Sequence, residues 1–278
     1  MSQPSTNFEI SSEGKLLREI VDFSKQSLAQ KRFNAHKMAD LLEKAYMSSR
    51  REPNDRAKKS FAPSGIGYGA GTCPRRWWYD FNGGVLRVDE PDAIGIANMA
   101  YGTEAHERIQ NLFDTAGILV EAERKVVTDD QPDMPPVFGF ADLIINWQGE
   151  EAVGEIKTTS QESFVAKSAK GQPAGYHLLQ VLIYMKVLGL NKGFLLYENK
   201  NSQQMLIMPV TWNVANTKLI DDTFEWMNLV YGNAMNGSLP KRPFRSEKSV
   251  VCKTCPFLKH CWNDEPGSVE LPVLEVPK

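Results

Sequence analysis

The sequence predicts a mixed α/β fold in which helices flank a central β-sheet. Segments with the apolar spacing of amphipathic helices alternate along the chain with short β-rich runs. Their order (helix, strands, helix, strands, helix) is typical of one mixed sheet covered by helices. A chain of 278 residues is also long enough to bury a sizeable core.

Apolar periodicity and turn residues place the individual elements. A helical region covers about 8–47, and the polar, then glycine-rich stretch 48–71 is typical of a loop. Thr72 as N-cap, with Pro74 in the first turn, predicts the start of the next helix. The elements expected from there are helices over 72–82 and 98–116, strands over 118–127, 137–147 and 152–159, a helix over 175–188, strands over 193–198 and 204–210, and a helix over 213–235.

We therefore expect three parts along the chain. Residues 1–63 are predicted to form a helical N-terminal extension, and residues 64–262 the main domain. Residues 263–278 contain proline and glutamate and are expected to form a disordered C-terminal tail.

The composition is that of an ordinary soluble globular protein, with 42% hydrophobic and 24% charged residues. No apolar run approaches the ~20 residues needed to span a bilayer, and the N-terminus shows no secretory signal pattern. We therefore expect a cytoplasmic protein without a membrane partner. The net charge of −2 does not mark a nucleic-acid binder, although local basic clusters such as Arg75-Arg76 permit one.

The most informative residues are Asp142, Glu155 and Lys157. Side chains alternate along a strand, so Glu155 and Lys157 share one face. If the hairpin turn is centred between Gln148 and Gly149, Asp142 lies directly opposite Glu155. The sequence therefore predicts two facing carboxylates, with a lysine two residues further along the strand that carries Glu155.

Facing carboxylates repel each other unless a cation lies between them. Oxygen ligands of this kind suit Mg²⁺ or Mn²⁺, which can activate water and neutralise charge on a phosphoryl group. Lys157 would then orient the water or stabilise the transition state. On spacing alone, an exposed Glu–Lys cross-strand pair explains the pattern equally well.

Two predicted helices carry further polar residues. His106 shares a helix face with Ile109 and Phe113, which places it on the buried side, toward the sheet. Gln180 and Tyr184 stand four residues apart, so both reach the same spot. Each of these residues, taken alone, is also explained by an ordinary core position.

Together these residues resemble the RecB-like branch of the PD-(D/E)XK nucleases over residues 64–262. The resemblance rests on motifs in chain order: His106, Asp142 in Gly-Phe-Ala-Asp-Leu, Glu155-Ile156-Lys157, and Gln180-Val-Leu-Ile-Tyr184. It implies a restriction-endonuclease-like core. The implied roles are metal binding by His106, Asp142, Glu155 and the Ile156 carbonyl, catalysis by Lys157, and support of the site and DNA contact by Gln180 and Tyr184. Ala141 replaces the proline that names the superfamily, and RecB-like members commonly lack it.

The four cysteines form a one-plus-three pattern. Cys252, Cys255 and Cys261 give C-x₂-C-x₅-C, and Cys73 stands far upstream. Four thiolates can hold zinc or an iron–sulfur cluster, but zinc ribbons and fingers use two close pairs. The pattern resembles the iron–sulfur staple of the same family, including AddB-type nucleases and the CRISPR-associated RecB-like exonucleases. We therefore expect a four-iron, four-sulfur cluster, with zinc as the alternative and unligated core cysteines last.

Aromatic residues follow Cys73 directly. Trp77, Trp78 and Tyr79 would stack bases of a single strand, and the neighbouring Arg75 and Arg76 would hold its phosphates. Packing of Trp77 or Trp78 beneath the cluster explains these aromatics equally well.

The expected function is a metal-dependent DNA exonuclease that acts on single strands or ends, with a lean toward 5′→3′ polarity taken from the resemblance. The expected setting is recombination, repair, phage DNA metabolism or spacer processing. The alternatives are a DNA-binding or scaffold subunit with dispensable catalysis and a zinc-containing structural protein. The sequence contains no G-x-x-x-x-G-K-[ST] phosphate loop, so unwinding would come from a helicase or recombination partner.

Overall fold

The computed structural model describes residues 34–49, 52–88, 91–128 and 133–277. The chain divides into a smaller unit, Met1–Glu52 with Asp89–Glu104, and a larger unit, Pro53–Val88 with Ala105–Lys278. In the smaller unit, α1 (Ala35–Ser48) begins at Asn34, whose side chain accepts a hydrogen bond from the backbone N–H of Lys37. The predicted helix over 8–47 is thus seen from residue 35 on, and its earlier part lies outside the described residues.

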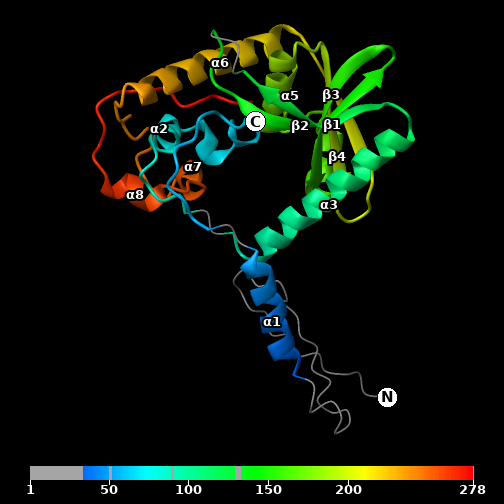
Figure 1. Cartoon of the computed structure of the whole chain (residues 1–278), viewed down its shortest axis with the longest axis horizontal. Coiled ribbons are helices and arrows are strands. Elements are labelled where there is room, and N and C mark those ends of the chain that lie inside the picture. The colour runs from blue at the N-terminus through cyan, green and yellow to red at the C-terminus, as the bar shows by residue number, and fades with distance from the viewer. Residues whose placement is uncertain (1–33, 50–51, 89–90, 129–132, 278) are drawn as a thin grey trace. The chain divides into compact units, whose positions relative to one another are not determined.

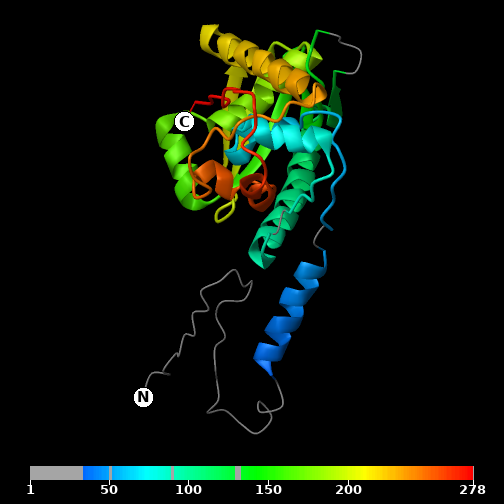
Figure 2. The same ribbon diagram turned by 90° about the vertical axis from the view of Figure 1, so that its left-hand side faces the viewer.

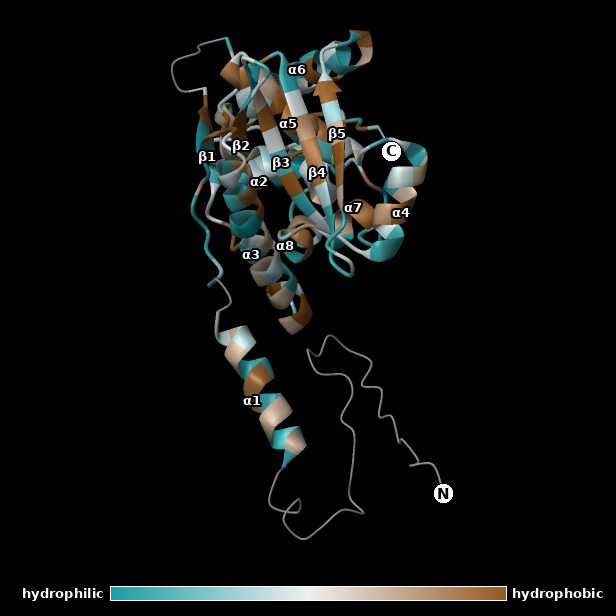
Figure 3. Ribbon diagram, turned by 90° about the vertical axis from the view of Figure 1, so that its right-hand side faces the viewer, coloured by the Kyte–Doolittle hydropathy of each residue, from teal (hydrophilic) through white to brown (hydrophobic). Residues whose placement is uncertain are grey.

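The larger unit is a five-stranded mixed sheet with its strands in chain order, flanked by helices (Figures 1 and 3). Strands β3 and β4 run parallel, and the other three neighbouring pairs are antiparallel. A parallel pair requires a crossover, which α4 and α5 provide. The strands are β1 (Leu119–Val127), β2 (Phe138–Trp147), β3 (Glu150–Thr159), β4 (Lys192–Asn199) and β5 (Met205–Thr211), and the crossover helices are α4 (Gln161–Lys170) and α5 (Gly175–Leu188).

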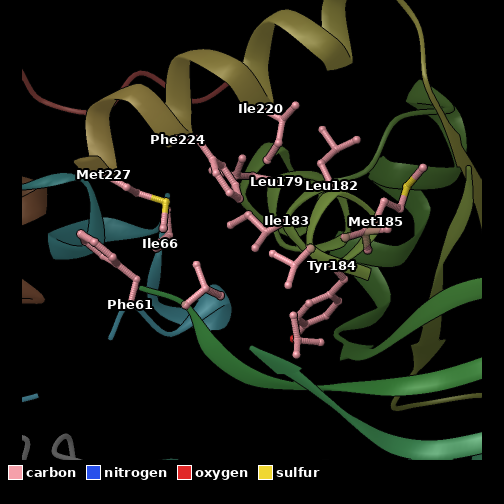
Figure 4. Packing of buried hydrophobic residues seen from close by; sticks show 14 of the residues in the cluster. Phe61, Ile66, Leu179, Leu182, Ile183, Tyr184, Met185, Ile220, Phe224 and Met227 are labelled. Atoms are coloured by element: carbon pink, nitrogen blue, oxygen red, sulfur yellow. The ribbon is translucent and has the colours of Figure 1, made fainter. Parts of the chain in front are cut away.

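One face of the sheet packs against α5, and α6 (Val214–Met235) lies behind that helix. Leu179 and Ile183 of α5 meet Ile220 and Phe224 of α6 in the main core (Figure 4). The helix α2 (Pro74–Asn82) packs against α6 in the same layer. Because α5 is largely surrounded by protein, it shows almost no amphipathic pattern. Two of its polar side chains, those of Gln180 and Tyr184, are buried.

The opposite face carries a second apolar cluster. Ile109, from the part of α3 (Ala93–Thr115) that belongs to the larger unit, packs against Leu143, Ile156 and Leu196 of three strands. Ile109 lies three residues after His106, on the same face of the helix. Its packing against the sheet agrees with the prediction that His106 faces the sheet. None of the helices in the described part of the chain is long and apolar enough to cross a membrane.

Two boundaries differ from the predicted ones. The larger unit begins at Pro53 rather than at residue 64, because Phe61 is fully buried in the main core. Residues 263–277 are not a loose tail, as the chain returns to the α2 and α6 layer (Figure 2). There, Leu274 donates its backbone N–H to the carbonyl of Thr72, and the carbonyl of Pro272 accepts from the indole of Trp226.

Three helices were not predicted: α4, α7 (Val250–Lys253) and α8 (Leu258–Asn263). No residue of α4 is buried, so the segment has no apolar stripe to mark it. The start of α2 is also shifted by one residue, because Cys73 is its N-cap and the hydroxyl of Thr72 donates instead to the carbonyl of Gly69.

Candidate active site

The hairpin between β2 and β3 sets the register of the site. Its turn consists of Gln148 and Gly149, both with positive φ angles (56° and 87°), as two-residue hairpin turns require. Pairing then runs from Trp147↔Glu150 to Leu143↔Gly154, so the next facing residues are Asp142 and Glu155. The predicted register is confirmed.

The two carboxylates are buried side by side. Asp142 is 7% exposed, and its Oδ2 accepts the backbone N–H of Ile156 at 2.7 Å. Glu155 is 2% exposed; its Oε1 accepts from Lys157 Nζ and from Gln180 Nε2, whereas its Oε2 has no hydrogen-bond partner among the described residues. Burial, together with the charge of Asp142, raises the pKa of Glu155 to about 7.

A third carboxylate, which the sequence analysis did not identify, lies on β1. The pairs Ala122↔Leu143 and Arg124↔Ala141 place Glu123 beside Asp142, so that Glu123, Asp142 and Glu155 form a row across three strands. Glu123 has a φ of 53°, a conformation that non-glycine residues seldom adopt. Such backbone outliers cluster at functional sites.

His106 joins this group from α3. Its Nδ1 lies 3.5 Å from Asp142 Oδ1, and one ligand atom each of His106, Glu123 and Asp142 lie within 4.8 Å of one another. Gln110 connects Glu123 to Asp142, since its Nε2 donates to Glu123 Oε1 (2.9 Å) and to the carbonyl of Asp142 (3.0 Å). Burial lowers the pKa of His106, but the hydrogen bond and charge of Asp142 outweigh burial, and the net pKa is raised.

Gln180 and Tyr184 support Glu155. Gln180 Nε2 donates to Glu155 Oε1 (2.7 Å) and to the hydroxyl of Tyr184 (2.8 Å), which itself donates to the carbonyl of Phe140 (2.9 Å). Burial raises the pKa of Tyr184, so the hydroxyl stays protonated. The two side chains are 4% and 2% exposed and present no surface to a DNA strand, which corrects the prediction that they contact DNA.

The residues fit a hard divalent cation. Carboxylate oxygens are its usual ligands, and the partnerless Oε2 of Glu155 leaves buried negative charge that such an ion would neutralise. Lys157 lies beside the pair with its side chain 23% exposed, so it can meet both the site and a bound substrate. The structure thus brings together His106, Asp142, Glu155, Ile156, Lys157, Gln180 and Tyr184, and the role of the Ile156 carbonyl stays a prediction.

The four cysteines line one cavity, together with Arg76, Tyr79, Arg242 and Trp262 among others. All four are free thiols. Burial raises the pKa of Cys73 to about 11 and that of Cys255 to about 12, so the bare thiols are protonated at neutral pH. Backbone N–H groups of Arg75, Arg76 and Phe257 act in the opposite direction on these two sulfurs, which is the arrangement that stabilises thiolates once a cation is present.

Of the arginines and tryptophans after Cys73, Arg75 and Trp77 are buried, and Arg76 and Trp78 are half-buried. Arg75 is 1% exposed and donates to the carbonyls of Pro240 (2.7 Å), Glu265 (2.6 Å) and Pro266 (2.9 Å). Arg76 is paired with Asp80 at 2.9 Å, and its guanidinium lies 4.0 Å from the centre of the Trp77 ring. Trp78 packs against the main core, with a buried Nε1. The burial of Arg75 contradicts the prediction that it binds a strand, whereas Arg76 and Trp78 are half-buried and their contact with a strand stays a prediction.

No family model and no curated protein matches the sequence. Among solved structures, the chain is similar to the alkaline exonuclease LHK-Exo from Laribacter hongkongensis, with a TM-score of 0.48 and 13% identity over 64% of this chain and 90% of that one. LHK-Exo in complex with dAMP gives a TM-score of 0.49 and 12% identity over 64% and 89%. The structure of SSO0001 gives 0.41 and 18% over 81% and 96%.

Proposed function

We propose that the protein is a divalent-metal-dependent DNA nuclease, a distant RecB-like member of the PD-(D/E)XK class. The observation that carries this proposal is the buried Asp142–Glu155 pair with its partnerless oxygen and with Lys157 beside it. A scaffold protein would gain nothing from burying two facing carboxylates, because their repulsion reduces stability unless a cation is bound.

Each residue has a distinct part in this proposal. His106, Glu123, Asp142 and Glu155 would hold the cation, which when bound supplies a polarised water and neutralises charge on the attacked phosphate. The N–H of Ile156 fixes the orientation of Asp142, and Gln180 fixes that of Glu155. The ammonium group of Lys157 would stabilise the charge that develops on the phosphate oxygens.

We further propose that the cysteine cavity holds a four-iron, four-sulfur cluster. All four thiols line this cavity, and one distant cysteine plus three close ones is unlike the two close pairs of zinc ribbons and fingers. The long gap between Cys73 and Cys252 would give the cluster a structural role.

The substrate and polarity belong to the same proposal. The motif resemblance favours cleavage from single-stranded ends in the 5′→3′ direction, with a helicase or recombination partner supplying any unwinding. The test uses strands labelled at the 5′ or the 3′ end, as single strands, duplexes and circles, with Mn²⁺, Mg²⁺ or EDTA.

We expect degradation of linear single strands with Mn²⁺ or Mg²⁺ and none with EDTA. Short products from the 5′ label at the earliest times would support 5′→3′ polarity. Rapid cutting of circles would overturn the exonuclease assignment but not the nuclease. No metal-dependent cleavage of any substrate would overturn the proposed function.

A further inference from the structure

Two tyrosines form an aromatic pair beside the carboxylate site. Tyr68 precedes η3 (Gly69–Thr72), and Tyr176 lies in the first turn of α5; their ring centres are 4.8 Å apart at an angle of 51°. Tyr68 is 56% exposed and Tyr176 is partly exposed. Tyr176 stands one helical turn before Gln180, which bonds Glu155, so the pair lies next to the site.

Contacts with residues of α5 and β4 hold the tyrosine pair in place. Tyr176 packs against His177 with ring centres 4.3 Å apart, and Nδ1 of His177 lies 2.9 Å from the hydroxyl of Tyr197 on β4. The same hydroxyl accepts the backbone N–H of Ala174 at the start of α5. A flat surface that is fixed before a ligand arrives loses little conformational entropy when the ligand binds.

Cationic groups flank the pair. The charge of Lys157 opposes the rise that burial causes in the pKa of Tyr176, and both Lys157 and Lys167 help to lower the pKa of His177, which burial depresses to about 3. The ammonium group of Lys167 also lies 5.1 Å from the ring centre of Tyr197. An exposed aromatic surface bordered by lysines has the chemistry of a single-stranded nucleic acid site, in which bases stack and phosphates pair with cations.

We propose that Tyr68 and Tyr176 form a stacking platform for an unpaired nucleobase of a DNA strand whose adjoining phosphate lies at Lys157. The proposal rests on the proposed nuclease function and adds to it the surface that would hold the single strand. Bases within a duplex are already stacked on their neighbours, so the platform selects a single strand. This platform is a different pair of aromatics from the Trp78 region considered in the sequence, and the fold brings it together across 108 positions of the chain, from 68 to 176.

The experiment measures binding without cleavage. Full-length protein in an Asp142→Asn background is titrated, by fluorescence anisotropy, against a labelled thymidine strand of about 12 nucleotides and against the same strand with abasic residues. The variants are Tyr68→Leu, Tyr176→Leu and Tyr176→Phe, which keeps the ring. Trp147→Leu is the matched control, because Trp147 is 50% exposed and lies at the hairpin turn, at the opposite end of β3 from Lys157.

We expect each leucine variant to lose about tenfold in affinity for the thymidine strand and less than about twofold for the abasic strand, as the removal of one base–aromatic stack predicts. Tyr176→Phe and Trp147→Leu should bind both strands like the parent protein. Equal losses on both strands, no loss on either, or no measurable binding of the thymidine strand by the parent protein would overturn the platform. Metal-dependent cleavage of the linear thymidine strand by the protein with Asp142 intact and both tyrosines present is measured in parallel, so failure of the nuclease proposal is recognised separately.

Discussion

The carboxylate site and the cysteine cavity both contain buried ionisable groups, but they are assembled in opposite ways. The carboxylate site takes Asp142, Glu155 and Lys157 from one hairpin, where hydrogen-bond register fixes their positions. The cysteine cavity joins Cys73 to Cys252 and its neighbours across most of the chain. In both, burial raises a pKa, to about 7 for Glu155 and to about 11 for Cys73, and in both a bound cation would offset the cost of burying the charged form.

The difference in assembly separates chemistry from stability. A site made by one hairpin keeps its shape when a single ligand is changed, because the strand pairing does not depend on that ligand. A site that connects distant segments closes a long loop, and closing it restricts the unfolded chain. We therefore expect substitutions at the carboxylates to act on turnover and substitutions at the cysteines to act on folding.

The largest effect is expected at the carboxylates. Asp142→Ala or Glu155→Ala should reduce single-turnover cleavage of a labelled strand by about 10³-fold or more, because a bound cation supplies several kcal/mol of transition-state stabilisation. The control is Asp221→Ala, which removes a carboxylate that is paired with Lys186 outside the site. Mn²⁺-dependent cleavage at the wild-type rate in either variant would contradict the assignment of Asp142 and Glu155 to the cation site.

Lys157 is expected to affect turnover and not affinity. A charge near the attacked phosphate acts mainly in the transition state, so Lys157→Ala should lower turnover by about 10²-fold or more while DNA binding changes little. Single-turnover cleavage and anisotropy measure the two quantities, with Lys186→Ala as the control. Equal losses in both would show that Lys157 serves binding instead.

The cysteines are expected to govern stability. Anaerobically purified protein should be brown and contain iron, and Cys73→Ser or Cys261→Ser should bleach it and lower the free energy of unfolding by about 3 kcal/mol or more, by analogy with a disulfide of that span. Proteolysis should then begin in the C-terminal segment, whose backbone carbonyls at Glu265 and Pro266 accept from Arg75 beside Cys73.

Lys253→Ser, an exposed change in the same segment, is the control for the cysteine variants. Stoichiometric zinc without iron would contradict the cluster and leave the nuclease proposal intact. A cysteine variant that folds as stably as the wild type would contradict the structural role.

The smallest effect concerns the pH dependence of the metal-free protein. The pKa of Glu155 is raised from 4.5 to about 7 in the folded state, so over that window the folded chain binds more protons than the unfolded chain. Stability contributed by this group is therefore lost as pH rises from 4.5 to 7, and Glu155→Gln should reduce that loss, by up to about 3 kcal/mol. Thermal unfolding at several pH values measures it, and an unchanged profile in the variant would show that Glu155 is not destabilised.

Local signals in the sequence were sufficient for the hairpin and insufficient elsewhere. The Gln148-Gly149 turn determines the register, so the facing of Asp142 and Glu155 could be predicted. Glu123 could not, because a register shift between Leu119 and Glu121 decides which side chains of β1 meet β2, and the sequence does not reveal it.

Burial of charged groups was the second limit. Arg75 has the composition of a surface phosphate contact, but its guanidinium is satisfied by carbonyls near residue 265, a long-range contact that no local pattern reports. The return of the C-terminal segment over the core also depends on long-range contacts, which no local sequence pattern reports. The fold class, by contrast, depends on periodicities within single elements, and the structure confirms it.

The most direct test of the central claim is the binding of Mn²⁺ to the folded protein, followed by electron paramagnetic resonance and calorimetry in the absence of DNA. The account predicts saturable binding by the wild type, together with an increase in its melting temperature. Glu155→Gln should weaken that binding strongly, and Glu123→Gln to a smaller degree, while Asp221→Asn should leave it unchanged. Mn²⁺ binding of wild-type affinity in the Glu155→Gln protein would show that the buried carboxylate pair does not hold the ion.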